Sequence, residues 1–487
     1  MSPSEATDAQ VLRLMRASLA LWRIGATIET APEGGWRVIT DAGGVVRIGR
    51  ASPDIPFRWM IVTDTDRERP ASSMTGLLRV LRSVLDPDWR PGRARVVSLT
   101  LPAESFAEPL QPHPPAQVGQ SPVLNQRPHP APDPSPSRRG ETPCARLAED
   151  PRVDSIVPVT VLTGFLGSGK TTLLARLLKS PEFARTAVII NEFGEIGIDH
   201  DLVTPSRESF VTLETGCICC VVRGDLEATL ADLVARRAMG ELPTFERVVI
   251  ETSGLADPAP VLNAVMAETG RGAGVALEGV VTTVDALAGL QTLEREPQAA
   301  RQVAIADRLV VTKVDLADGG PTPDLIGRLR ALNPHARPLL AVSGDVPPAV
   351  VIGSGRSHRF PDAAMPPGWD HKIAHDTDIA CVAIRRGEPV PALALPLFLE
   401  ALADHIGTDL LRLKALVRVA EDPLRPAVLH GVQHLFHEPQ WLDAWPSDDH
   451  DTRMVLIGRG LSQLWIEALL EAIVAEVAEL ASVQPPP

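Results

Sequence analysis

The hydrophobic residues in the middle of the chain fall into short β-branched runs separated by helix-length segments. Such runs occupy residues 157–164, 186–191, 247–252, 279–285 and 308–312. Continuous runs of Val, Ile and Thr between helix-length segments are typical of parallel strands that are buried on both faces. The pattern over residues 156–350 therefore predicts an α/β fold with a doubly wound, mostly parallel sheet.

The first part of the chain mixes the two periodicities. Helix-like stretches lie at residues 9–22 and 72–85, and short alternating runs lie at 34–40, 43–49 and 57–63. A turn sequence, Asp-Ala-Gly-Gly at 41–44, separates two of these runs and is typical of a hairpin. We expect residues 1–102 to form a small α+β N-terminal domain, and no motif in it suggests a catalytic site.

The last part of the chain is also of mixed type. Strand-like runs at 378–386 and 453–460 alternate with helix-like stretches at 395–406 and 461–481. This pattern predicts a smaller α+β C-terminal domain over residues 376–482. The apolar stripe Ile466, Leu469, Ile473 and Val477 in the final helix favours a place in the core over a groove for a partner.

Composition changes between residue 103 and residue 155, where proline and polar residues dominate. Such a segment cannot bury a core, so we expect a disordered linker. The whole chain has 487 residues and a net charge of −14, which argues against broad binding to nucleic acid or to anionic membranes. Its start lacks the pattern of a signal peptide, and no run reaches the ~18 apolar residues of a membrane span. We expect a soluble, cytoplasmic protein.

Residues 164–171 match the spacing G-x-x-x-x-G-K-[ST] directly after a predicted strand and before a predicted helix. The glycines allow backbone N–H groups to curl around phosphate oxygens, and the helix N-terminus adds its positive end. Lys170 is placed to neutralise the β- and γ-phosphates, and Thr171 to ligate Mg²⁺. The predicted phosphate-binding residues are Gly164, Gly167, Ser168, Gly169, Lys170, Thr171 and Thr172.

A carboxylate late in the sheet would select the base of the nucleotide. Asp315 follows the run at 308–312 and is placed to accept hydrogen bonds from guanine N1–H and the 2-amino group, which adenine cannot supply. The stem of Lys313 is placed to lie along the base. The usual guanine motif is Asn-Lys-x-Asp, and Thr312 replaces the Asn here, with a hydroxyl that can brace the loop. The sequence favours GTP over ATP.

Two acidic segments complete the predicted nucleotide site. Glu251 ends the run at 247–252 and is a candidate Mg²⁺ ligand, while the N–H of Gly254 is placed to sense the γ-phosphate. The acidic, glycine-containing segment 191–202 follows another strand, as a switch segment does, and contributes Glu192. The candidate catalytic residues are Lys170, Glu192 and Glu251.

Three of the five cysteines, Cys217, Cys219 and Cys220, lie within four positions. In C-x-C-C, thiolates can converge on one side of a turn, and thiolate ligands favour zinc, cobalt or cuprous copper over magnesium. Two or three such ligands leave the site incomplete, which suits an ion that must leave again. A packed hydrophobic cluster and a thiol redox site are the alternatives, although the thioredoxin context of C-x-x-C is absent.

Taken together, the motifs resemble those of the CobW-like metallochaperone GTPases, which are relatives of the GTPases that insert nickel into urease and hydrogenase. The motifs GFLGSGKTTLL, NEFGEIGIDHDL, TGCICC, ETSGLADP and TKVDL occur in the family's order, and the resemblance covers residues 156–480. It implies GTP hydrolysis with Mg²⁺, phosphate binding by Gly164 to Thr172, and a hydrolysis site that includes Glu251.

The same resemblance implies guanine recognition by Asp315 and Zn²⁺ or Co²⁺ binding by Cys217, Cys219 and Cys220, with delivery of the ion to a client metalloprotein. Family analogy also makes a homodimer plausible. The first ~155 residues have no counterpart in the family pattern. A metal-responsive GTPase switch without metal transfer is the main alternative, and a small-molecule kinase is the other.

Overall fold

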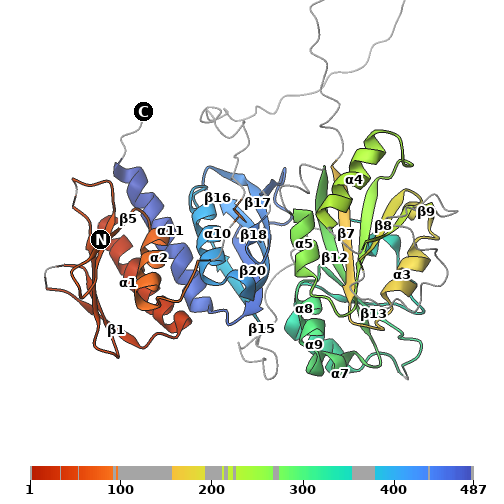
Figure 1. Ribbon diagram of the computed structural model, residues 1–487, viewed down its shortest axis with the longest axis horizontal. Coiled ribbons are helices and arrows are strands. Elements are labelled where there is room, and N and C mark those ends of the chain that lie inside the picture. Colours follow the sequence, from red (N-terminus) through yellow and green to blue (C-terminus); the bar gives the residue numbers. More distant parts are fainter. Residues whose placement is uncertain are drawn as a thin grey trace, which may run out of the picture. The chain divides into compact units, whose positions relative to one another are not determined.

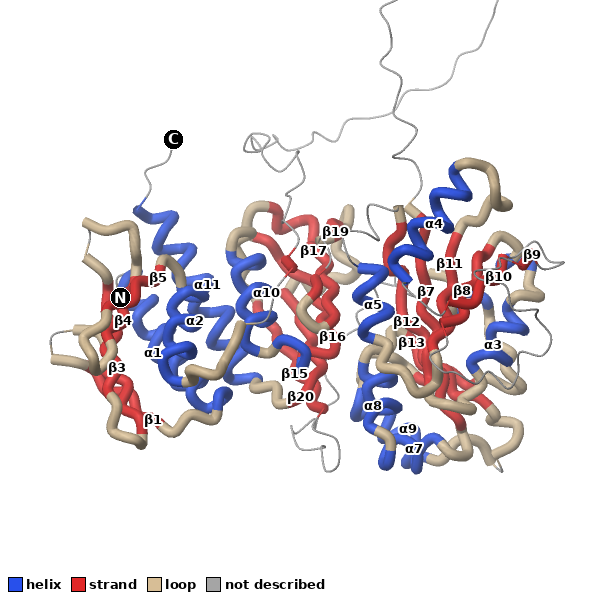
Figure 2. The backbone as a smooth tube through the Cα atoms, viewed as in Figure 1, coloured by secondary structure: helices blue, strands red, loops and turns tan. Residues whose placement is uncertain are grey.

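A computed structural model describes the chain in segments separated by gaps. The described residues are 3–32, 34–52, 54–91, 95–96, 156–191, 211–212, 218–222, 226–266, 274–317, 319–353, 379–436 and 439–483. They form three β-sheets, each associated with helices (Figures 1 and 2). The predicted linker over 103–155 lies outside these residues.

The central sheet has eight strands in the order β14-β13-β12-β7-β11-β8-β10-β9. All neighbours in it pair in parallel except β9 and β10, which are antiparallel. The strands are β7 (Val157–Gly164), β8 (Thr186–Asn191), β9 (Val211–Thr212), β10 (Ile218–Val222), β11 (Arg247–Thr252), β12 (Val275–Asp285), β13 (Arg308–Thr312) and β14 (Pro338–Leu340). This topology confirms the predicted doubly wound, mostly parallel sheet.

Helices cover both faces of this sheet because its strands are apolar on both sides. Val161 and Leu162, adjacent on β7, are fully buried in two different hydrophobic clusters. The smaller cluster includes α3 (Lys170–Leu177) and the 3-10 turns η2 (Pro181–Phe183) and η3 (Pro348–Val350). The larger one includes α4 (Leu226–Ala238), α5 (Ala259–Met266), α7 (Gly289–Arg295), α8 (Pro297–Ala304) and α9 (Pro323–Leu332). Figure 1 shows α3 and α5 on opposite sides of β7.

The C-terminal sheet is built mainly from antiparallel strand pairs, which together with its helices agrees with the predicted α+β class. It contains β15 (Ile379–Arg386), β16 (Leu410–Val419), β17 (Asp422–Val432), β18 (Leu435–Phe436), β19 (Gln440–Trp441) and β20 (Thr452–Arg459). A short strand from the N-terminal part, β6 (Arg95–Val96), pairs in parallel with β18. The helices of this region are α10 (Ala394–His405) and α11 (Gln463–Val483), with the turn η4 (Gly407–Asp409).

The N-terminal region is a five-stranded antiparallel sheet with two helices, which confirms its α+β class. Its elements are α1 (Pro3–Trp22), β1 (Ala26–Thr30), β2 (Trp36–Thr40), β3 (Val45–Arg50), β4 (Trp59–Val62), β5 (Glu68–Ala71) and α2 (Met74–Leu85). This region shares one hydrophobic cluster with α10 and α11, in which Ile466, Leu469 and Ile473 are fully buried. The apolar stripe of the final helix therefore packs in a core, as predicted.

Polar contacts inside that shared core join residues from the two ends of the chain. The indole Nε1 of Trp465 on α11 donates to Ser18 Oγ at 2.9 Å. Glu476, which is 1% exposed, accepts a hydrogen bond from the backbone N–H of Met74 at the start of α2. The N-terminal and C-terminal regions are thus held together by both apolar and polar contacts.

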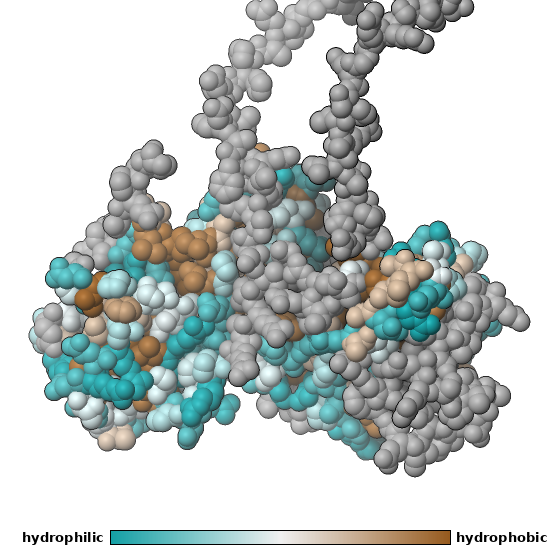
Figure 3. Space-filling model, turned by 45° about the horizontal axis from the view of Figure 1, so that its top comes forward, coloured by the Kyte–Doolittle hydropathy of each residue, from teal (hydrophilic) through white to brown (hydrophobic). Residues whose placement is uncertain are grey.

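The surface of the described residues is mostly hydrophilic in the view of Figure 3, and hydrophobic side chains gather in smaller patches. Within the described part of the chain, every helix is too short or too polar to span a membrane.

Candidate functional site

The predicted phosphate loop joins the end of β7 to the start of α3. Gly164, Gly167 and Gly169 have φ values of +143°, +74° and +89°, which side-chain-bearing residues rarely adopt. A Cβ on Gly164 would lie 2.3 Å from Thr283 Oγ1. No side chain caps the N-terminus of α3, and the N–H groups and positive dipole end of a helix N-terminus favour an anion. The backbone here has the conformation that the sequence motif requires.

Lys170 is 8% exposed, and its ammonium group folds back over the loop. Its Nζ donates to the carbonyl oxygens of Gly164 at 2.9 Å and Phe165 at 3.3 Å. These contacts hold the cation at the mouth of the loop, where the phosphates of a nucleotide would be neutralised.

Buried hydroxyl groups of Ser168, Thr283 and Thr312 brace the phosphate loop. Ser168 Oγ lies 2.7 Å from Thr283 Oγ1, and Thr312 Oγ1 donates to Ser168 O at 2.7 Å and to Val284 O at 3.2 Å. Thr312 is 3% exposed, so this bond is shielded from water. The residue that replaces the usual Asn thus makes the loop-bracing hydrogen bond that the sequence suggested.

The two predicted Mg²⁺ ligands lie in direct contact. Thr171 Oγ1 on the first turn of α3 donates to Glu251 Oε1 at the end of β11, across 2.6 Å. Glu251 is 5% exposed. A hydroxyl and a carboxylate beside a phosphate loop form the oxygen-rich donor set that Mg²⁺ prefers, and the residues present fit this ion.

Gly254 lies directly against the phosphate loop. A Cβ at this position would come within 2.7 Å of the N and Cα atoms of Leu166 and 3.1 Å from Lys170 Nζ. Only glycine permits this approach without movement of the loop backbone. The structure therefore brings the predicted γ-phosphate sensor next to Lys170.

The predicted guanine-binding residues lie beyond the end of β13. Asp315 is exposed, and its carboxylate accepts hydrogen bonds from the backbone N–H of Ser343 at 2.9 Å and from Ser343 Oγ at 3.0 Å. The hydrogen bond from the Ser343 N–H is the main reason that the pKa of Asp315 lies below its ordinary value. Sequence reasoning missed Ser343, whose only signal is a Ser-Gly pair after the last strand of the sheet.

Lys313 occupies the left-handed region at φ +58° and donates to Asp285 Oδ2 at 2.6 Å. Burial alone would raise the pKa of Asp285. Hydrogen bonds from Lys313 and from the backbone N–H groups of Leu287 and Ala288 outweigh this effect and lower it. Asp285 was also missed, because a single Asp at a strand end is common. It fixes the lysine whose stem was predicted to lie along the base.

The structure describes only part of the predicted switch segment and cysteine cluster. Glu192 and Cys217 lie outside the described residues, and for Cys219 and Cys220 only the backbone is described, on β10. That strand pairs Cys219 with Val188 of β8 and Val211 of β9. Among the side chains that are described, no three of His, Cys, Asp and Glu gather in a way that would hold a metal ion.

Comparison with known proteins agrees with this geometry. Residues 158–339 match the model of the CobW/HypB/UreG nucleotide-binding domain, and residues 379–474 match the cobalamin synthesis protein CobW C-terminal domain. The zinc chaperone YjiA of Escherichia coli is 32% identical over 313 residues, which cover 64% of this chain and 97% of that protein. The zinc chaperone CobW of Pseudomonas aeruginosa is 30% identical and covers 70% of this chain and 98% of its own length.

The crystal structure of Zn(II)-bound YjiA GTPase from Escherichia coli is similar to the structure described above. The two share a TM-score of 0.54 and 30% identity over 65% of this chain and 98% of that one. The chain therefore belongs to the CobW/HypB/UreG family of nucleotide-binding proteins and carries the CobW C-terminal domain.

Proposed function

We propose that this protein is a GTP-hydrolysing metallochaperone that binds Zn²⁺ or Co²⁺ and couples its nucleotide state to delivery of the ion to a client metalloprotein. The observation that carries this proposal is the contact of Thr171 with Glu251 beside a phosphate loop of the required conformation. The similarity to two zinc chaperones supports a metal ion such as Zn²⁺ as the cargo.

In the proposed reaction, the N–H groups of the loop and of the first turn of α3 bind the phosphates of GTP. Lys170 exchanges its carbonyl partners for phosphate oxygens. Thr171 and Glu251 would hold Mg²⁺, which would supply positive charge to the phosphate oxygens. Glu192 orients a water molecule, whose oxygen forms a bond to the γ-phosphorus while one of its protons passes to a γ-phosphate oxygen. The bond between the γ-phosphorus and the bridging oxygen breaks, giving GDP and phosphate.

The cargo ion is proposed to bind the thiolates of Cys217, Cys219 and Cys220. In the central sheet, β10 with Cys219 and Cys220 is the immediate neighbour of β8, after which Glu192 follows in sequence. This adjacency supports a coupling between the γ-phosphate and the metal site. A useful coupling would be about 1–3 kcal/mol, or roughly 5- to 150-fold in metal affinity.

The test is metal affinity by competition with a chelator, for Zn²⁺ and for Co²⁺, with a non-hydrolysable GTP analogue and with GDP. We expect tighter binding by about tenfold in the GTP state. We expect Cys219→Ala to lose affinity, while Cys381→Ala, a matched control in β15, keeps it. Burial raises the pKa of the Cys381 thiol to about 12, so that this cysteine remains a thiol.

Zinc transfer to a purified apo-metalloprotein then separates the proposal from its rival. A metal-responsive GTPase switch predicts nucleotide-dependent binding without transfer. Unchanged metal affinity in Cys219→Ala would refute the cysteine site, and loss of phosphate release in Glu251→Gln would support the hydrolytic site. Self-association, measured in the two nucleotide states, tests the proposed homodimer.

A further inference from the structure

Helix α8 contacts the loop that contains Gly254 through a buried amide. Gln302 is 0% exposed, and its Nε2 donates to Gly254 O at 3.3 Å and to Ala256 O at 3.1 Å. Because carbonyl oxygens only accept hydrogen bonds, the NH₂ group of the Gln302 amide must face them. Gln302 thus fixes two peptide groups of the loop that lies against Lys170.

The neighbouring residue of α8 holds the same loop at a third point. Arg301 donates to Asp257 Oδ2 at 3.2 Å, while Asp257 Oδ1 accepts from the backbone N–H of Ala259 at the start of α5. Successive residues of one helix therefore fix residues 254–257 as a unit.

Gln302 also lies behind the phosphate loop. It lines a small cavity of about 40 Å³ together with Phe165 and Ser168 of the loop and Thr283 of β12. The buried amide thus contacts the Gly254 loop directly and lines the same cavity as Ser168, which binds phosphate in the proposed function.

The other end of α8 leads to an ion-pair cluster with the C-terminal domain. Asp307 accepts from Arg412 at 2.9 and 3.1 Å, and from Lys414, both on β16. The side chains of Asp307 and Arg412 are 1% and 7% exposed. Burial would raise the pKa of Asp307, but the charges of Arg412 and Lys414 hold it far below its ordinary value.

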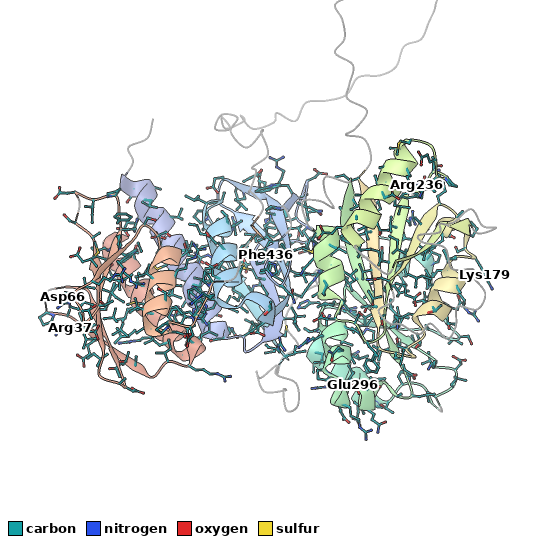
Figure 4. All side chains as sticks on the ribbon, viewed as in Figure 1. Arg37, Asp66, Lys179, Arg236, Glu296 and Phe436 are labelled. Atoms are coloured by element: carbon teal, nitrogen blue, oxygen red, sulfur yellow. The ribbon has the colours of Figure 1, made fainter. Side chains whose placement is uncertain are left out.

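Asn333 holds the end of α8 and the residues that lead from it to Asp307. The side-chain amide of Asn333 donates to the carbonyl oxygens of Val303, Ala304 and Ala306. On the far side of the loop, Asn263 of α5 donates to Gln433 at 3.2 Å, and apolar residues of α5 share a hydrophobic cluster with β16 and β17. The Gly254 loop is therefore held by α8 and leads into α5, and both helices contact the C-terminal domain. Glu296, which immediately precedes α8, is labelled in Figure 4.

We infer that Gln302 is a positioning residue that holds Gly254 for the γ-phosphate of GTP, and that α8 transmits the nucleotide state from this loop to β16 of the C-terminal domain. The inference rests on the proposed function, since it assumes that GTP binds the phosphate loop. Neither Gln302 nor the rest of α8 belongs to the nucleotide-binding motifs.

The experiment compares Gln302→Met, which keeps the shape of the side chain and removes its donors, with Thr282→Val. Thr282 is also 0% exposed, and its hydroxyl donates to Gln302 O at 2.8 Å, so this control loses a buried hydrogen bond on α8 without touching the loop. Affinities for a non-hydrolysable GTP analogue and for GDP are measured on the full chain. Hydrogen exchange of residues 410–419 is followed in both nucleotide states.

We expect Gln302→Met to weaken binding of the GTP analogue by about tenfold and to leave GDP affinity unchanged, since GDP has no γ-phosphate. The nucleotide-dependent exchange difference in β16 should disappear in this variant and persist in Thr282→Val. An unchanged preference for the GTP analogue over GDP, or a β16 difference that survives in Gln302→Met, would overturn the inference while the proposed function stands.

Arg301→Ala provides a second variant in case Gln302→Met does not fold. The side chain of Arg301 is 24% exposed, compared with 0% for Gln302, so its removal should perturb the fold less. It should lower the preference for the GTP analogue in the same direction, and an unchanged preference would count against the inference. A wild-type protein that binds neither nucleotide would overturn the proposed function and the inference together.

Discussion

Thr171 and Glu251 are 80 residues apart in the sequence, and their side-chain oxygens lie 2.6 Å apart in the structure. The contact exists because β7 and β11 are neighbours in the central sheet, so that the loop after β7 and the end of β11 meet at one edge. Carboxyl ends of parallel strands are the usual position of ligand sites in such folds. The geometry supports a shared Mg²⁺ site formed by these two side chains.

Glu251→Gln should reduce single-turnover GTP hydrolysis by about a hundredfold or more, because one charged ligand at the developing phosphate charge is lost. The variant should also lose the part of its GTP affinity that depends on Mg²⁺. Glu278→Gln is the control: this carboxylate lies in β12 and accepts from Thr160 and Gly353, away from the phosphate loop. Equal losses in the two variants would indicate a general effect on the fold.

Thr312→Val should weaken both GTP and GDP binding by roughly three- to tenfold. The substitution preserves the shape of the side chain and removes the 2.7 Å hydrogen bond to Ser168 O, a buried contact with a net value of about 1 kcal/mol. Both nucleotides are affected because the braced loop binds phosphates common to them. Isothermal titration calorimetry measures the effect, and Thr312→Ser, which keeps the hydroxyl, should bind as the wild type does.

The phosphate loop could be predicted from sequence because its glycines, lysine and threonine all lie within residues 164–171, and local backbone geometry determines their arrangement. The parallel sheet was predictable for a similar reason, since each buried strand has its own apolar run. Strand order has no such local signal. The motifs identified Thr171 and Glu251 as candidate Mg²⁺ ligands, but only the strand order in the folded protein brings them into contact.

Long-range polar contacts were beyond the reach of sequence reasoning. Gln302 lies in a helix whose other residues are mostly small or apolar, and nothing in that pattern distinguishes a buried amide from a solvated one. The core shared by residues of α1 and α11 also depends on pairing between the two ends of the chain. Each region shows an apolar stripe alone, but neither stripe identifies its partner.

Asp315→Asn should shift base preference away from guanine. In the proposed site the carboxylate accepts from N1–H and the 2-amino group of guanine, whereas an amide would offer a donor that suits the carbonyl of xanthine. We expect GTP affinity to fall by more than tenfold and xanthosine triphosphate affinity to rise. Ser343→Ala, which removes only the 3.0 Å hydroxyl contact to Asp315, should lower affinity less and preserve the preference for guanine. A variant that binds both nucleotides as the wild type does would place guanine recognition elsewhere.

His405 should make the fold less stable as the pH falls below about 6.5. Its ring is 8% exposed and stacks on Trp22 and Trp89 with centroids 5.3 and 5.4 Å away. Burial, followed by the charges of Arg82 and Arg79, lowers its pKa to about 3. The unfolded chain takes up a proton at this histidine near pH 6.5, whereas the folded protein does not, so acid favours unfolding.

Between about pH 7.5 and pH 5, this histidine should cost roughly 2 kcal/mol of unfolding free energy. Urea unfolding at the two pH values measures the loss, and His405→Phe should remove it while keeping the stacked arrangement. The pKa of His335 is also lowered, to about 4, chiefly by burial. This second histidine is unchanged in His405→Phe, so its part of the pH dependence of the unfolding free energy should remain. If His405→Phe retained the full pH dependence, the protonation of other groups would have to explain it.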